Sequence, residues 1–164
     1  MKLALVAVGR LRATGAAGAA GAAGLARDYA ERLGHYASLD LVEVKAARGG
    51  RGAEIDRAVE EEGARLLAAL RPDDRVVLFD ERGRELSSRG LADFLAEAER
   101  TGGPRRFVFL VGGAWGVSRA VRDRAERTLS LSKMTLPHEL ARVVALEQLY
   151  RAFTILRGEP YHHA

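Results

Sequence analysis

The most informative absence in the 164-residue sequence is cysteine, of which there is none. Disulfide bonds, zinc–thiolate centres and thiol nucleophiles are therefore excluded. The sequence also lacks a signal peptide and any apolar run long enough to span a bilayer. We therefore expect one soluble, cytoplasmic domain over residues 1–164, with no membrane partner. Lysine is scarce too, at three of the 26 basic residues, and the net charge of +4 permits an anionic partner without requiring one.

Strand-like apolar segments alternate with helical patterns along the whole chain. Each of the five predicted strands is followed by a predicted helix, and these strands begin at Met1, Leu39, Arg75, Phe107 and Leu129. Such alternation predicts an α/β fold around a parallel, Rossmann-like sheet, with a doubly wound topology as the simplest arrangement. Residues 13–26 are rich in glycine and alanine, which favours either a weak helix start or a flexible loop, and the helix is better supported over 25–33.

Two segments end an apolar run in a tight turn, and the rest of the chain is organised around them. Residues 107–118, FVFLVGGAWGVS, carry three glycines after a strand, and residues 129–138, LSLSKMTLPH, carry the second turn. Glycine permits close approach of a ligand to the main chain, although it also serves simply to turn a strand into a helix. Ser118 is a suitable N-cap for a helix predicted to continue through Arg127.

A dinucleotide-binding fingerprint is the obvious alternative for the first turn. The spacing is GGxxG rather than GxGxxG, and no acidic residue occurs in residues 131–134, where the ribose partner is expected. A nicotinamide site is therefore not predicted.

Three further features carry charged or titratable groups. The third predicted strand, residues 75–80, ends at Asp80 and Glu81, which suit either a metal or catalytic site or the capping of the next segment. Arg48 and Arg51 form a basic loop that is either a solvated surface or a phosphate contact. His138 follows Pro137 at a helix start, where it either accepts a proton near neutral pH or acts as a structural cap.

The last predicted helix, residues 138–157, is apolar around nearly its whole circumference, which indicates burial on several sides. Either a subunit interface or a central core position explains this pattern. Arg142, one turn after His138, is expected to share its face and to hold a phosphate or carboxylate. Arg151 is a similar candidate, while Tyr150 suits the core.

Several motifs, taken in order, resemble those of one known family. They are MKLALVAVGR at 1–10, VGGAWG at 111–116, MTLPH at 134–138, LEQLYRA at 146–152 and PYH at 160–162. Together they resemble the RlmH family of SPOUT-class methyltransferases over nearly the whole chain. The sequence departs from that family in the Gly/Ala-rich stretch, and at Ala114 and Trp115, where many relatives have Pro-Glu, so we assign neither of these two residues any chemistry.

The resemblance implies a SPOUT fold with a deep trefoil knot over about residues 75–164, and a homodimer whose active site lies between subunits. It implies S-adenosylmethionine as cofactor and no metal. The cofactor-binding residues that it implies, with Gly113 added as a neighbour, are Leu78, Gly112, Gly113, Leu131, Ser132, Lys133, Met134, Thr135 and Leu136.

The resemblance also implies a function and further site residues. It implies phosphate contact for Arg48 and Arg51, and substrate or catalytic roles for Tyr161 and His162. On residue type and position, Arg142 and Arg151 join the expected substrate-binding residues and His138 joins the expected catalytic residues. The expected reaction is methylation of N3 of a pseudouridine in a stem-loop of large-subunit ribosomal RNA, on the assembled ribosome. Two alternatives remain open: a SPOUT methyltransferase acting on transfer RNA, and a ribosome-binding protein without enzymatic activity.

Overall fold

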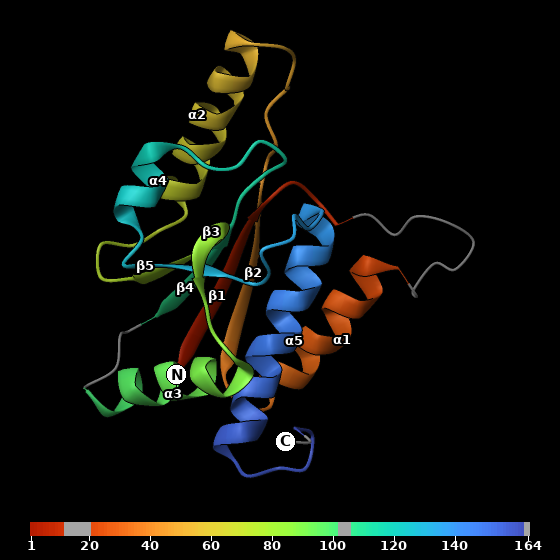
Figure 1. The fold of residues 1–164 in the computed structure, drawn as a ribbon, viewed down its shortest axis with the longest axis vertical. Helices are drawn as coiled ribbons and strands as arrows, with labels where there is room; N and C mark the ends of the chain where they lie inside the picture. Colours follow the sequence, from red (N-terminus) through yellow and green to blue (C-terminus); the bar gives the residue numbers. More distant parts are fainter. Residues whose placement is uncertain (12–20, 102–105, 163–164) are drawn as a thin grey trace.

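The computed structural model describes residues 1–11, 21–101 and 106–162, and its core is a five-stranded sheet (Figure 1). All neighbouring strands are parallel, in the order β2-β1-β4-β3-β5. The predicted α/β fold with a parallel sheet is therefore confirmed. The strands are β1 (Lys2–Val8), β2 (Ser38–Val44), β3 (Arg75–Glu85), β4 (Phe107–Val111) and β5 (Arg127–Ser130).

Helices cover both faces of this sheet. On one face lie α1 (Ala22–Gly34), α3 (Ser88–Arg100) and α5 (His138–Leu156), and on the other lie α2 (Ala53–Ala68) and α4 (Arg119–Arg124) (Figure 1). Each face has its own apolar cluster. None of the helices in the described part of the chain combines the length and apolarity needed to cross a membrane.

The central strands are apolar at successive positions because both of their faces are covered. Phe107 and Phe109 of β4 point into the cluster beneath α3 and α5, whereas Val108 and Leu110 point into the cluster beneath α2 and α4. All five residues of β4 are buried.

Helix α5 packs against both α1 and α3 over the sheet, so contacts within one chain account for much of its apolar circumference. Leu140 near its start and Leu156 at its end remain exposed. Helix α1 begins at Ala22, while the Gly/Ala-rich residues before it, 12–20, lie outside the described residues.

The predicted ends of one strand and one helix were wrong by several residues. The strand expected to stop at Asp80 continues to Glu85, because both Phe79 and Arg84 pair with Leu129 and the residues between them form a bulge. The helix expected to reach Arg127 ends at Arg124, because Arg127 already belongs to β5. Both errors come from strand pairing, which periodicity along one segment does not reveal.

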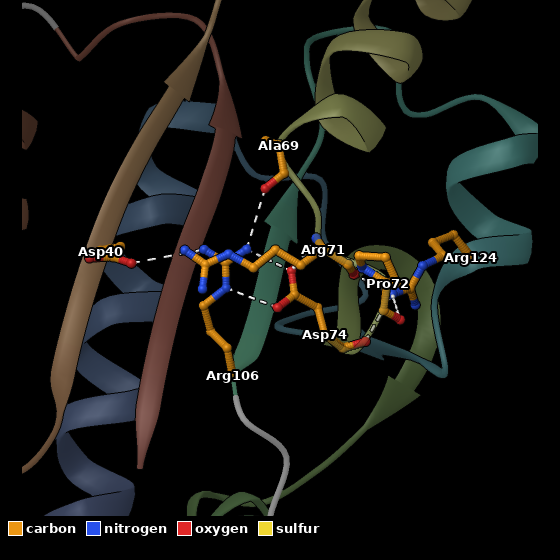
Figure 2. Close-up of polar contacts among 7 residues, drawn as sticks. All are labelled: Asp40, Ala69, Arg71, Pro72, Asp74, Arg106 and Arg124. Atoms are coloured by element: carbon orange, nitrogen blue, oxygen red, sulfur yellow. Dashed lines mark hydrogen bonds and ion pairs between the residues drawn. The ribbon is translucent and has the colours of Figure 1, made fainter.

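A buried ionic cluster holds the amino-terminal edge of the sheet (Figure 2). The Arg106 guanidinium donates to both carboxylate oxygens of Asp74, at 2.9 and 2.6 Å, and lies 3.8 Å from Asp40 of β2. Arg124 of α4 donates to the carbonyl oxygens of Arg71 and Asp74 in the same turn. The cluster thus connects the start of β4 to β2, to α4 and to the turn before β3.

The Asp74 carboxylate is almost fully buried, yet its pKa is lowered. Burial alone opposes ionisation, but the hydrogen bonds from Arg106 and from the backbone N–H of Arg71 outweigh it. A lowered folded-state pKa means that this carboxylate stabilises the fold above its ordinary pKa. That contribution is lost as the pH falls through the folded-state value.

We expect Asp74→Ala to lower the free energy of unfolding by about 3–5 kcal/mol at pH 7, because it leaves Arg106 buried without its partner. Urea denaturation measures this. Asp93→Ala, at an exposed position on α3, is the matched control and is expected to change stability by less than about 0.5 kcal/mol.

The difference between wild type and Asp74→Ala is expected to narrow as the pH falls below about 4, where the carboxyl of the unfolded chain begins to bind a proton, and to vanish below the lowered folded-state pKa of Asp74. A difference that stays constant from pH 7 to pH 3, or an equal loss in the control, would contradict the role assigned to this pair.

Candidate active site

A hollow of about 650 Å³ lies at the carboxyl ends of β3, β4 and β5, on the edge of the sheet opposite the ionic cluster. Its volume falls in the range of roughly 300–1,000 Å³ that is usual for ligand pockets. In open α/β folds ligands bind at this edge. The hollow is lined by residues 79–82, 111–117, 131–132 and 134–138, with Arg122 and Ala141.

The turn after β4 forms one wall. Gly116 has a φ of +85°, a conformation that favours glycine, and its N–H donates to Gly113 O at 3.2 Å. A Cβ on Gly112 would lie 2.6 Å from Val117 Cγ1, so the turn leaves no room for a side chain there. Gly113 is equally restricted, because a Cβ would lie 2.4 Å from a carboxylate oxygen of Glu62 in α2.

The turn between β5 and α5 forms the opposite wall. The Ser130 hydroxyl donates to Ser132 O at 2.8 Å, and the Ser132 hydroxyl accepts from the Met134 N–H at 3.0 Å. The Thr135 hydroxyl donates to Glu81 at 2.8 Å, which connects this turn to the bulge in β3. Met134 is 77% exposed, so an apolar side chain stands open at the rim.

Of the nine residues expected at the cofactor site, the structure brings seven together as lining of this hollow: Gly112, Gly113, Leu131, Ser132, Met134, Thr135 and Leu136. The other two lie elsewhere. Leu78 is completely buried in the cluster beneath α2 and α4, while the next residue, Phe79, lines the hollow instead. The Lys133 side chain is exposed and lies 3.6 Å from Glu85.

Acidic and basic side chains outside the expected cofactor-binding set also line the hollow. Asp80 is ion-paired with Arg122 of α4 at 2.8 Å and accepts from the Arg82 N–H at 2.9 Å. Asp80 therefore caps the turn that follows it, and capping was one of the two roles predicted for it. Its place at a strand end was visible in the sequence, whereas Arg122 gave no signal because only the packing of α4 turns it toward this edge.

His138 is the first residue of α5 and lines the hollow. It shares a helix face with Arg142, as predicted: a Cβ added at Gly9 would lie 3.8 Å from His138 Nε2 and 3.7 Å from an Arg142 nitrogen. The two residues differ in exposure. Arg142 is buried, donating to Gly9 O at 2.8 Å and to Glu43 at 3.2 Å, so its guanidinium joins α5 to β1 and β2. Burial lowers its pKa, and Glu43 opposes this effect.

The C-terminal tail lies at the other end of α5 from His138 (Figure 1). The Tyr161 hydroxyl donates to Glu147 at 3.1 Å, and its ring packs edge-on against Tyr150 with centroids 4.7 Å apart. The Arg151 guanidinium lies 4.7 Å from the centre of the same ring. Arg151 is about 20 Å from His138 along the helix axis, so these residues form a cluster apart from the hollow.

Two properties of this tail bear on its chemistry. Burial, a hydrogen bond with Tyr29 and the nearby Glu147 carboxylate all raise the pKa of Tyr161, so the phenol stays protonated at neutral pH. His162 has its Nδ1 atom buried without a hydrogen-bond partner in the described residues.

The basic loop lies beside the hollow. A Cβ on Gly49 would lie only 2.7 Å from Trp115 Nε1, so the loop packs directly on the tryptophan at the rim. Arg48 and Arg51 are both exposed there. Arg48, Arg51, Arg142 and Arg151, expected together as substrate contacts, thus lie in three different environments.

Comparison with known proteins identifies the family. The family described as "Predicted SPOUT methyltransferase" matches residues 1–162. The chain belongs to this SPOUT methyltransferase family.

Its curated relatives narrow the assignment. It is 50% identical over 162 residues to the ribosomal RNA large subunit methyltransferase H of Anaeromyxobacter sp., and 48% identical over 163 residues to that of Gloeobacter violaceus, with 99% of each chain covered. It is 51% identical over 136 residues to that of Geotalea daltonii, covering 83% of this chain and 86% of the relative. The resemblance to the RlmH family is therefore confirmed.

SPOUT methyltransferase membership implies S-adenosylmethionine as the methyl donor. The hollow fits such a molecule in size, and its lining offers apolar side chains for an adenine, backbone groups in two turns and charged groups at the β3 bulge. Within the described residues, no group of histidine and acidic side chains is arranged to hold a metal ion.

Proposed function

We propose that this protein transfers a methyl group from S-adenosylmethionine to N3 of a pseudouridine in a stem-loop of large-subunit ribosomal RNA, on the assembled ribosome and in the cytoplasm. The observation that carries the proposal is near-complete alignment, at about half identity, with relatives named as ribosomal RNA large subunit methyltransferases. The pseudouridine, its N3 atom, the assembled ribosome and the deep trefoil knot of residues 75–164 follow from the family resemblance.

S-adenosylmethionine would supply an electrophilic methyl group on its sulfonium. The residues proposed to hold it are Gly112, Gly113 and the turn 131–136, which wall the hollow on two sides. Leu78 is buried in the core behind this wall, so we propose no direct contact between its side chain and the cofactor. The Lys133 side chain lies outside the hollow, beside Glu85. The protein's main task is then to hold two reactants in line and to exclude water.

The N3 atom of a pseudouridine carries a proton that must leave before or during attack. His138 is our candidate acceptor, because it lines the hollow and a neutral imidazole nitrogen can accept a proton. Tyr161 is a poorer base, because its raised pKa keeps the phenol protonated. A stacking or hydrogen-bonding role with the target base suits it better.

Tyr161 and His162 do not line the hollow of their own chain, because the tail packs on α5 away from His138, where Tyr161 contacts Glu147 and Tyr150. We therefore infer a homodimer in which the tail of one subunit completes the active site of the other. The exposed Leu140 and Leu156 on α5 are suited to such an interface.

The direct test is transfer of label from S-adenosylmethionine to assembled ribosomes lacking the modification, isolated large subunits and naked ribosomal RNA. We expect label only in assembled ribosomes, mapping to N3 of a pseudouridine. Label in transfer RNA alone would overturn the substrate assignment. No label together with no cofactor binding would instead favour a ribosome-binding protein without enzymatic activity.

Gly112→Val is expected to abolish cofactor binding, because its side chain must displace Val117 and the Gly116 backbone. Calorimetry with S-adenosylmethionine measures the loss, and a cooperative thermal melt shows that the variant is folded. Gly34→Val is the matched control, since a Cβ at Gly34 meets nothing within 4 Å. If folded Gly112→Val binds with wild-type affinity, Gly112 does not belong to the cofactor site.

Mixing two inactive variants tests the shared active site. Gly112→Val disables the cofactor site of its own chain, and His162→Ala disables the tail. If the tail acts across the interface, a mixed dimer keeps one intact active site, formed by the cofactor site of the His162→Ala chain and the tail of the Gly112→Val chain. Co-refolded variants are then expected to recover about a quarter of wild-type activity, the share set by random pairing in a twofold dimer. No recovery in demonstrated heterodimers would mean that each tail serves its own chain.

A further inference from the structure

A second hollow, of about 630 Å³, lies on the other side of the basic loop, against α2. Its lining includes four cations and two carboxylates, and therefore carries an excess of positive charge. The lining residues are 45–49, Glu54, Arg57, Ala58, Glu61 and Arg65. We refer to this hollow as the α2 groove.

Three of its four cations are available to a ligand. Arg65 is occupied, because it donates to Lys45 O at 2.8 Å and pairs with Glu61 at 3.3 Å. Lys45, Arg48 and Arg57 are exposed, and their side chains have no ion pair or hydrogen bond within the described residues. Arg51 does not line the groove.

One of the two carboxylates is occupied as well, by the ion pair to Arg65 just described. The other, that of Glu54, accepts from the Arg51 N–H at 3.2 Å. The Arg65–Glu61 pair is neutral and Glu54 offsets one of the three remaining cations, so the α2 groove keeps an excess of positive charge, which suits an anion.

The α2 groove is held in a defined position relative to the candidate active site. Glu62, which is buried, accepts from the Ala47 N–H at 3.0 Å through one carboxylate oxygen, and its other oxygen lies against Gly113. Gly49 of the same loop packs on Trp115. The loop that separates the two hollows is therefore fixed to the turn that walls the first.

We propose that the α2 groove is a phosphate subsite, in which Lys45, Arg48 and Arg57 hold the RNA backbone beside the nucleotide in the active-site hollow. This proposal rests on the proposed function, which makes RNA the ligand. A strand that inserts one nucleotide into the first hollow must carry its neighbouring phosphates across the rim. Three unpaired cations on the far side of Trp115 offer them charge-assisted hydrogen bonds.

The test is equilibrium binding to assembled ribosomes that lack the modification and carry labelled large-subunit ribosomal RNA, measured across a salt series. The proteins are wild type and the single variants Lys45→Gln, Arg48→Gln and Arg57→Gln. Each substitution is expected to weaken binding about three- to tenfold and to make the slope of log K against log salt shallower by about 0.7–0.9. S-adenosylmethionine affinity and melting temperature are expected to stay at wild-type values.

Arg100→Gln is the charge-matched control, because Arg100 is exposed at the end of α3 and pairs only with Glu97 in the described residues. It is expected to leave both affinity and slope unchanged. Wild-type affinity in the three groove variants, an equal effect in the control, or no RNA binding by wild type would each overturn the proposal.

Methyl transfer to assembled ribosomes, measured with the same variants, separates this proposal from the proposed function. A raised KM with unchanged kcat supports the subsite. If RNA binding depends on the groove but the wild-type protein transfers no methyl group to any ribosomal RNA, the proposed function is wrong and the subsite is still supported.

Discussion

The position of β4 between β1 and β3 is the constraint on which the candidate site depends. Its residues pair on one side with β1, where Val111 lies opposite Ala7, and on the other with β3, where Val111 lies opposite Phe79. The segments that follow these three strands therefore emerge side by side. This register brings Gly112, Asp80 and Gly9 to one edge of the sheet, where the hollow forms. The ionic cluster around Arg106 holds the other end of β4 in place.

The glycines of the site are explained first by packing within the chain. Gly112 faces Val117, Gly113 faces Glu62, and Gly63 of α2 faces the Ser118 hydroxyl, where a Cβ would lie 2.2 Å away. Each contact draws a neighbouring element close to the turn after β4. The same absence of side chains leaves the inner surface of the turn as backbone, which a cofactor can approach. Close packing and ligand access are therefore two consequences of one sequence feature.

Helix α5 separates two groups of residues that the sequence analysis expects at one active site. His138 stands at its start beside the hollow, while Arg151 and Tyr161 cluster around Glu147 in the middle of the helix. Along the helix axis Glu147 is about 14 Å and Arg151 about 20 Å from His138, so the two groups lie apart within one chain. The homodimer proposed above resolves this separation, because a second chain can bring its tail to the first chain's hollow.

The sequence by itself determined the α/β class, the parallel sheet, the two turns and the family, because hydrophobic periodicity, glycine spacing and ordered motifs are local properties of the chain. The tertiary structure decided which residues meet. It directed Arg142 inward to Gly9 O and Glu43, buried Leu78 behind Phe79, and turned Arg122 toward Asp80. It also placed Arg57 of α2 beside Arg48. These outcomes depend on strand order and helix packing between residues distant in sequence, and no local pattern encodes such contacts.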